Sequence, residues 1–278
     1  MATATDPMII TAEAAGVGID GAERPTEDRI VVPPNAVILL DGATALDKRD
    51  HTAAWYVDHL SAELATQLGT NPQADLRDTL AQAIATLAAR HHLTPGKAPS
   101  STVALLRWTP DHLDALVLAD SPIVAFTPTG PDVLADDRIA ALPKRPGGYR
   151  ARLTDGAGFD PGHVAALRAA GARTGSLRNI PGGFWVAEAD PAAAQQARTK
   201  RWPRANVHAV LMASDGVSCG IDDYRILTWP QTLDLATTQG PQAVLDEVRK
   251  AEQNDADGQR WPRPKRHDDQ ALALIRFP

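Results

Sequence analysis

Short hydrophobic runs that stop at turn residues recur along the whole chain. Such runs, four to eight residues long and bounded by Gly, Pro, Asn or Asp, are typical of buried strands. We expect strands at Met8–Ala14, Arg29–Val32, Ala36–Leu40, Ser101–Trp108, Leu113–Ala119, Pro122–Phe126, Phe184–Ala187, Val207–Ala213 and Ala271–Phe277.

A second pattern, with apolar residues three and four positions apart, predicts helices between some of these strands. It runs from Trp55 to Leu68 and from Leu76 to Leu87, and two further helices are expected near Thr232–Thr237 and Gln242–Gln253. The order is strands, two helices, strands, two helices and a strand. Few strands alternate with single helices, which argues against a doubly wound parallel sheet. Two antiparallel sheets with helices packed outside would accommodate this order.

One region stands apart from this pattern. Pro128–Gly182 is richer in Pro, Gly and Arg, and its apolar runs are short, with one helical piece around Val164–Ala170. We therefore expect a single domain over residues 1–278, with a variable surface excursion at about residues 128–182.

The composition of the chain excludes some classes of binding partner and indicates a cellular compartment. The 28 Lys and Arg residues against 34 Asp and Glu give a net charge of −6, which argues against nucleic acid or an anionic membrane as partner. The single cysteine, Cys219, excludes a disulfide framework and a cysteine-rich zinc site and fits a reducing cytoplasm. Met1–Pro7 lacks the features of a signal peptide, and no run of about 18 apolar residues predicts a membrane span.

Acidic residues stand at the ends of several predicted strands. A carboxylate at a strand end is fixed by the sheet while its head can converge with others outside the core. Any one of these positions alone is typical of an ordinary turn. Clustered carboxylates repel one another unless a cation neutralises them, and hard oxygen ligands select Mg²⁺ or Mn²⁺. The acids in question are Glu27, Asp28, Asp41, Asp120, Asp215 and Asp268.

Six short motifs, in order along the chain, resemble those of the metal-dependent protein phosphatases of type 2C, the PPM family. The resemblance implies an α+β fold, a four-layer α-β-β-α sandwich of two antiparallel sheets flanked by helices, and identifies the chain as a divergent member. The motifs are Arg24–Asp28, Val37–Gly42, Ser101–Val103, Ala119–Ser121, Leu211–Val217 and His267–Gln270.

The resemblance also implies roles for individual residues. Asp41, Asp215, Asp268 and the Gly42 carbonyl would hold two Mn²⁺ or Mg²⁺ ions, and Asp120 would help hold a weaker third. Asp269, which replaces the family's usual Asn, is placed with this metal group. Arg24 would contact the substrate phosphate, and the pair Glu27 and Asp28 completes the predicted catalytic set.

Two departures from the family pattern bear on this interpretation. Ala119 stands where the family has Gly, and Arg178–Trp185 occupies the place of the family's later Ser-Arg…Gly-Asp segment. The second departure affects substrate recognition more than the metals.

The resemblance implies a phosphoserine/phosphothreonine phosphatase that acts on phosphorylated proteins, and the composition fits a cytoplasmic one. Hydrolysis of a phosphate monoester needs acceleration of up to ~10²¹-fold, whereas a general acid or base supplies only about 10²–10⁴ of it. Two cations that activate a water and neutralise the phosphoryl oxygens fit this demand. The alternatives are a non-catalytic binding module on the same fold, or a phosphatase of small metabolites.

Two other motifs compete with this interpretation. Cys219 and Arg225 have the Cys-x5-Arg spacing of cysteine-dependent phosphatases, but Asp222 and Asp223 between them would repel a phosphate. The segment Gly16–Gly21 matches a dinucleotide-binding fingerprint by its letters, yet no amphipathic helix follows it. We expect a packing residue in the first case and a turn in the second.

Overall fold

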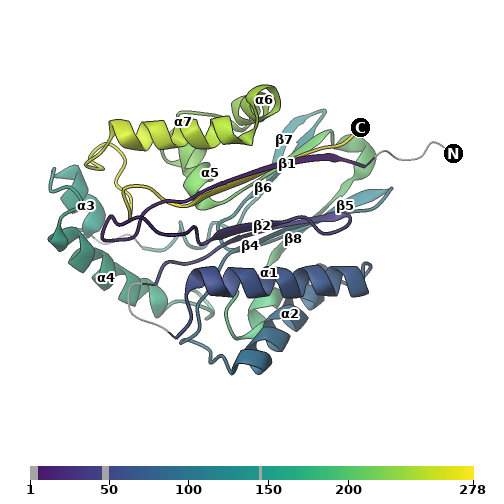
Figure 1. The fold of residues 1–278 in the computed structure, drawn as a ribbon, viewed down its shortest axis with the longest axis horizontal. Coiled ribbons are helices and arrows are strands. Elements are labelled where there is room, and N and C mark those ends of the chain that lie inside the picture. The colour runs from purple at the N-terminus through teal and green to yellow at the C-terminus, as the bar shows by residue number, and fades with distance from the viewer. Residues whose placement is uncertain (1–5, 46–49, 144–145) are drawn as a thin grey trace.

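Two five-stranded sheets lie face to face, and helices cover the outer face of each (Figure 1). The computed structural model describes residues 6–45, 50–143 and 146–278. Residues 1–5 lie outside the described range, and most of Met1–Pro7, where no signal peptide is expected, is among them. Among the described helices, none is long and apolar enough to cross a membrane.

Every named strand pairing is antiparallel. The first sheet has the order β1-β10-β9-β6-β7, formed by Met8–Ala14, Gln270–Arg276, Ala209–Ala213, Ile123–Thr127 and Gly130–Leu134. The second sheet has the order β2-β3-β4-β5-β8, formed by Asp28–Val31, Ala36–Asp41, Val103–Trp108, His112–Leu118 and Arg198–Pro203.

The helices fall into three groups. Those packed on the second sheet are α1 (Ala53–Thr70) and α2 (Leu76–His91), and those over the first sheet are α5 (Asp215–Asp222), α6 (Trp229–Gln239) and α7 (Pro241–Asn254). Two more, α3 (Tyr149–Thr154) and α4 (Pro161–Gly175), lie together at one end of the sandwich (Figure 1). Short 3-10 helices span Pro191–Gln196 (η1) and Arg204–Asn206 (η2).

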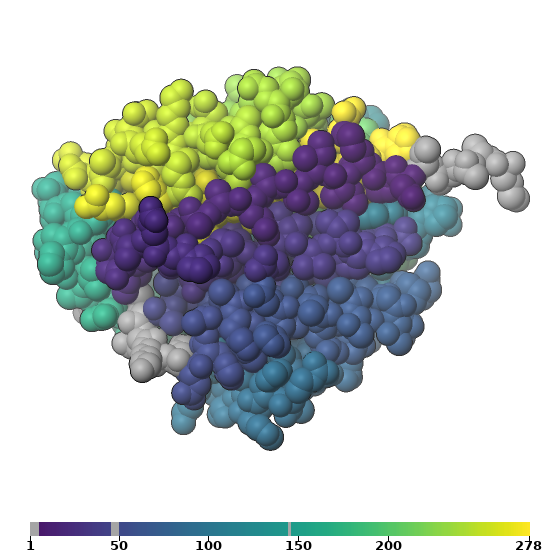
Figure 2. All heavy atoms as spheres, in the orientation of Figure 1, coloured from purple at the N-terminus to yellow at the C-terminus, as the bar shows by residue number. Residues whose placement is uncertain are grey.

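The central strands are apolar on both faces because both faces are covered. On β3, Val37 and Leu39 join the core between the sheets, whereas Ile38 and Leu40 pack in the cluster with α1 and α2. A strand buried on both sides needs a continuous hydrophobic run instead of an alternating one. The space-filling view shows β1 and β2 side by side at the surface, between the C-terminal helices and α1 (Figure 2).

The four-layer α-β-β-α architecture predicted from the sequence is confirmed, but some elements differ. Phe184–Ala187 is not a strand and makes only isolated bridges, one of them between Ala187 and Ser101. Gly130–Leu134, expected within the surface excursion, is edge strand β7, so the departure from the sandwich begins after it. Arg198–Pro203 forms edge strand β8, which its polar, basic sequence did not indicate.

Candidate metal centre

The acids predicted to act together come from separate elements that end at one side of the sandwich. Asp28 begins β2 and lies opposite Asp41, the last residue of β3. Asp215 is the first residue of α5, directly after β9, and Asp268 lies two residues before β10. Asp120 sits in the turn between β5 and β6. Helices α3 and α4 lie at the end of the sandwich where the loop before β10 runs (Figure 1).

Burial and mutual repulsion raise the pKa of four of these carboxyls. Burial is the larger cause for Asp28, Asp41 and Asp215, and the negative charges of neighbouring acids add to it. Asp41 and Asp215 each add to the upward shift of the cluster, because the charge of Asp41 raises the pKa of Asp215 and the charges of Asp28 and Asp268 raise that of Asp41. The pKa of Asp120 rises to about 6 through burial and the charges of Asp136 and Asp268.

Asp28 is the most unusual member of this acidic cluster (Asp28, Asp41, Asp120, Asp215 and Asp268). The residue is fully buried beside the Ser214 hydroxyl, and neither of its side-chain oxygens makes a hydrogen bond of normal geometry in the described part of the chain. A buried carboxylate without a partner is costly, and such groups are normally paired or bound to a metal. An oxygen-only donor set of this kind fits Mg²⁺ or Mn²⁺.

Glycine follows two of the acids because the backbone packs too closely there for a side chain. A Cβ atom on Gly42 would stand 2.7 Å from the Glu27 carbonyl oxygen, and one on Gly216 would stand 1.9 Å from that of Asp269. The backbone N–H of Asp41 donates to Thr102 Oγ1 at 3.1 Å, and this hydroxyl bonds in turn to Ser121 at 2.6 Å. Asp41 is therefore fixed by the neighbouring strand β4 and by the turn that carries Asp120.

The turn before Asp120 explains the family's glycine at position 119. Ala119 has φ +68°, the left-handed conformation that costs most residues roughly 1–2 kcal/mol. Its N–H donates to the buried Asp136 carboxylate at 3.3 Å, which supports this conformation. Asp136 is also held by Arg138, whose Nε donates at 2.7 Å and whose second nitrogen makes an ion pair. Sequence reasoning missed both residues because they lie in a segment without regular spacing.

A buried lysine also lies in the cluster. Lys265 forms an ion pair with Asp268 and donates to Thr44 Oγ1 at 3.1 Å, with its side chain only 7% exposed. Burial alone would lower the pKa of Lys265, but attraction to Asp268 outweighs it and the net shift is upward. The lysine precedes Asp268 by three residues in a polar loop, where no motif marked it.

Asp269 is engaged differently from the predicted metal contact. One of its oxygens accepts from the Gly16 N–H at 2.7 Å, and the other forms an ion pair with Arg24 at 2.6 Å. Arg24 pairs as well with Glu27, at 2.8 Å. Asp269 therefore holds Arg24 and the segment after β1, and its contact with a metal stays a prediction.

The helices of the excursion are tied to the loop that carries Lys265 and Asp268. Arg150 in α3 donates to the Pro262 carbonyl at 2.6 Å, and His163 in α4 donates from Nε2 to the Pro264 carbonyl at 2.7 Å. In the other direction, the side-chain amide of Gln259 in the loop donates to the Thr154 carbonyl of α3 at 3.2 Å. These hydrogen bonds thus join the α3–α4 pair to this loop beside the cluster.

The carboxylates do not yet form a finished coordination group. Among the described residues, no three His, Cys, Asp or Glu side chains stand close enough to hold a metal ion as they are. The cluster is coupled electrostatically, so its side chains would have to turn toward a shared cation.

Neither competing motif forms a site. Burial raises the pKa of the Cys219 thiol well above its usual value, and the charge of Glu252 raises it further, which is the reverse of an activated nucleophile. Gly16–Gly21 forms a turn, in which Gly18 N–H bonds to the Ala22 carbonyl at 2.8 Å. A Cβ on Gly16 would stand 2.4 Å from the backbone of Asp268, so this glycine serves close packing.

Solved structures show what the fold resembles. The PPM Ser-Thr phosphatase MsPP from Mycobacterium smegmatis, in complex with cacodylate, has a TM-score of 0.57 and 15% identity, covering 99% of this chain and 100% of that one. The serine/threonine phosphatase Stp1 from Staphylococcus aureus has a TM-score of 0.59 and 12% identity, with 100% and 98% covered.

The catalytic domain of the serine/threonine phosphatase PstP in complex with two manganese ions has a TM-score of 0.55 and 14% identity, with 98% of each chain covered. At these identities the likeness establishes the fold. No family model and no curated protein sequence matches the chain.

Proposed function

The chain has the fold of the PPM Ser/Thr phosphatases, and on that premise we propose that it is a metal-dependent phosphatase of phosphoserine and phosphothreonine in proteins. The observation that carries the proposal is the acidic cluster, in which Asp28 is buried, Asp41, Asp120 and Asp268 are half-buried and Asp215 is exposed. Asp28, Asp41 and Asp215 have raised pKa values from burial and mutual repulsion, and the two oxygens of Asp28 make no hydrogen bond of normal geometry in the described chain. Structural carboxylates are normally paired, so this arrangement supports a site that awaits divalent cations.

In this proposal Asp41, Asp215 and Asp268 hold the cations, with the Gly42 carbonyl as a further ligand and Asp120 at a weaker third position. When bound, the cations would lower the pKa of a water and neutralise the phosphoryl oxygens. The chain holds the backbone of these residues, through Thr102 for Asp41 and through the helix start for Asp215, and their side chains would turn toward the cations.

Arg24 and Lys265 both lie near the cluster, and we use the exposure of their side chains to assign the phosphate contact. The Arg24 side chain is 18% exposed, and its guanidinium is held in place by Glu27 and Asp269. The Lys265 side chain is 7% exposed and its ammonium is engaged by Asp268 and Thr44. A guanidinium offers a planar, bidentate contact to phosphate oxygens. We therefore assign the phosphate contact to Arg24.

The test is hydrolysis of a phosphothreonine peptide with Mn²⁺ and with excess chelator. We expect turnover only with the metal, and we expect Asp41→Asn and Asp215→Asn each to lose at least ~10²-fold, or about 2.7 kcal/mol of barrier. Asp111→Asn is the matched control, because this exposed aspartate lies in the β4–β5 turn and makes no side-chain contact in the described chain. Full turnover in chelator, or equal losses in Asp111→Asn, would refute the proposal.

One observation favours a second candidate, a non-catalytic binding module on this fold. The Lys265 ammonium already neutralises Asp268, which is the role that a cation plays in the phosphatase proposal. Equilibrium binding of Mn²⁺ separates the two functions when measured beside hydrolysis. Tight metal binding without turnover on peptide or aryl phosphate would select the binding module, and turnover on aryl phosphate alone would select a phosphatase of small molecules.

A further inference from the structure

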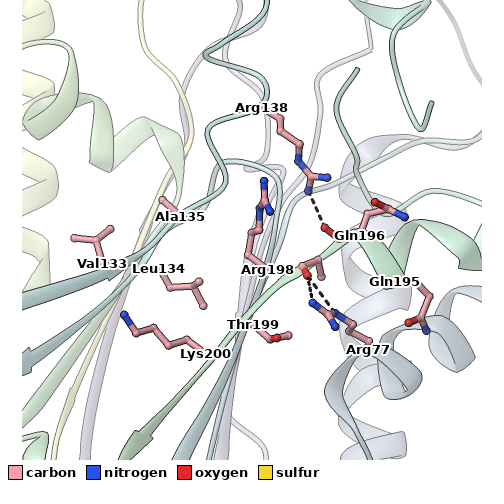
Figure 3. Close-up of a pocket in the computed structure, with 11 residues that line it drawn as sticks. Arg77, Val133, Leu134, Ala135, Arg138, Gln195, Gln196, Arg198, Thr199 and Lys200 are labelled. Carbon is pink, nitrogen blue, oxygen red and sulfur yellow. Dashed lines mark hydrogen bonds between the residues drawn. The ribbon is translucent and has the colours of Figure 1, made fainter. Parts of the chain in front are cut away.

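A basic groove opens between the two edge strands on one side of the sandwich. It has a volume of about 460 Å³ and is bordered by β7, by η1, by the start of β8 and by the first turn of α2. Figure 3 shows Arg77, Arg138, Arg198 and Lys200 around this opening. We call these four residues and the space between them the edge groove.

Its charge is opposite to that of the protein as a whole. The chain carries −6 overall, yet four cations border the edge groove. Lys200 pairs with Asp132 at 2.6 Å and Arg138 pairs with Asp136. The Arg77 guanidinium donates to the Ala197 carbonyl, at 2.8 and 3.2 Å, and has no carboxylate partner in the described chain. At least two positive charges are therefore left for a ligand.

Arg198 is the cation that the fold uses least. Its side chain is exposed, and within the described residues it makes no hydrogen bond or ion pair. No contact within the described residues therefore explains why position 198 is an arginine. An exposed guanidinium beside a second unpaired one is a suitable contact for carboxylate or phosphate groups.

The strand pairing places the edge groove beside the turn that carries Asp120. Arg198 lies opposite Val117, three residues before Asp120, and Leu134 lies opposite Ile123, three residues after it. The Arg138–Asp136 pair then connects the groove wall to the Ala119 N–H in that turn. A ligand in the groove would thus lie next to the candidate metal centre without occupying it.

We propose that the edge groove binds an acidic, extended peptide segment of a protein partner, using Arg198 and Arg77 as its main contacts. The shape supports a peptide because β7 and β8 are each paired on one side only, as in sheets that accept an added strand. The volume lies within the roughly 300–1,000 Å³ of ligand sites. If the partner is the phosphoprotein substrate, that identity rests on the proposed function. The binding of an acidic segment does not depend on it.

The test measures binding of a fluorescent peptide of Glu and Ser by anisotropy, beside the same peptide with Gln in place of Glu. The full-length protein is kept in chelator, so that the acidic peptide cannot reach added cations. We expect binding of the Glu peptide only, weakened by salt, and roughly fivefold to tenfold weaker binding in Arg198→Glu because attraction becomes repulsion. Arg276→Glu is the control, since Arg276 is an exposed arginine at the opposite end of β10 from Asp268.

Three results would overturn the proposal. The first is equal binding of the Glu and Gln peptides, and the second is equal weakening by Arg198→Glu and Arg276→Glu. The third is binding of inorganic phosphate that Arg198→Glu abolishes while the Glu peptide binds no better than the Gln peptide, which would make this a site for free phosphate. No turnover enters this assay, so its failure beside intact Mn²⁺-dependent hydrolysis refutes the groove alone.

Discussion

Replacing Asp120 by Asn removes one negative charge from the acidic cluster while keeping the side-chain shape nearly unchanged. In the presence of chelator the wild-type protein has to carry this carboxylate next to Asp136 and Asp268. The variant therefore measures what the cluster costs the fold when no cation neutralises it. We expect Asp120→Asn to be more stable than the wild type under these conditions.

The size of the gain follows from the pKa of Asp120. Burial and the neighbouring charges raise this pKa from 3.8 to about 6, a shift of roughly two units. Each unit corresponds to about 1.4 kcal/mol, so the penalty above pH 6 approaches about 3 kcal/mol as an upper bound. Since the folded state binds this proton more tightly than the unfolded state, the contribution of Asp120 to wild-type stability is most favourable below about pH 4 and is lost as pH rises through 6. Asparagine has no such dependence.

Urea denaturation in chelator at pH 4, 5.5 and 7.5 checks this reasoning. The free energy of unfolding of Asp120→Asn should exceed that of the wild type at pH 7.5, and the difference should close by pH 4. Asp111→Asn, at an exposed turn, should show no pH-dependent difference. A variant less stable than the wild type at pH 7.5, or a difference that is the same at pH 4 and 7.5, would refute the claim that repulsion and burial at Asp120 destabilise the metal-free fold.

Two further changes examine the neighbourhood of the cluster. Lys265→Met should tighten Mn²⁺ binding in calorimetry by roughly tenfold, because the ammonium on Asp268 no longer repels the incoming cation; weaker binding would instead mean that Asp268 needs the lysine to keep its position. Cys219→Ser should leave phosphatase turnover unchanged and the folded wild type should resist thiol reagents, because burial raises the pKa of the thiol; inactivation by such a reagent would contradict this assignment.

The elements that could be predicted are those whose signal is local. Asp41 follows a run of buried residues and precedes a glycine, so its place at a strand end is visible in six adjacent residues. The ion pair between Asp269 and Arg24 could not be predicted from the sequence. It joins positions 245 residues apart and depends on how two loops pack. Lys265 lies in a polar loop without periodicity, where burial comes from contacts with Thr44 and Asp268.

Strand β8 was missed for a related reason. Its sequence is basic and most of its side chains are exposed, because it is an edge strand with a partner on one side only. Charged side chains are common on edge strands, and on β8 they mask the strand signal in the sequence. The extended conformation of β8 depends on its pairing with β5, and this pairing is seen only in the folded chain.

The bonds between α3–α4 and the loop before β10 bear on how this part of the molecule can vary. Arg150 and His163 hold the backbone of Pro262 and Pro264, within six residues of Asp268. A chimaera that exchanges only the α3–α4 segment with a protein of the same fold would break these contacts and free the loop that carries Asp268. The two stretches, far apart in sequence, therefore form one module for protein engineering, and a transplant that preserves the acidic cluster has to carry residues 255–267 together with the helices.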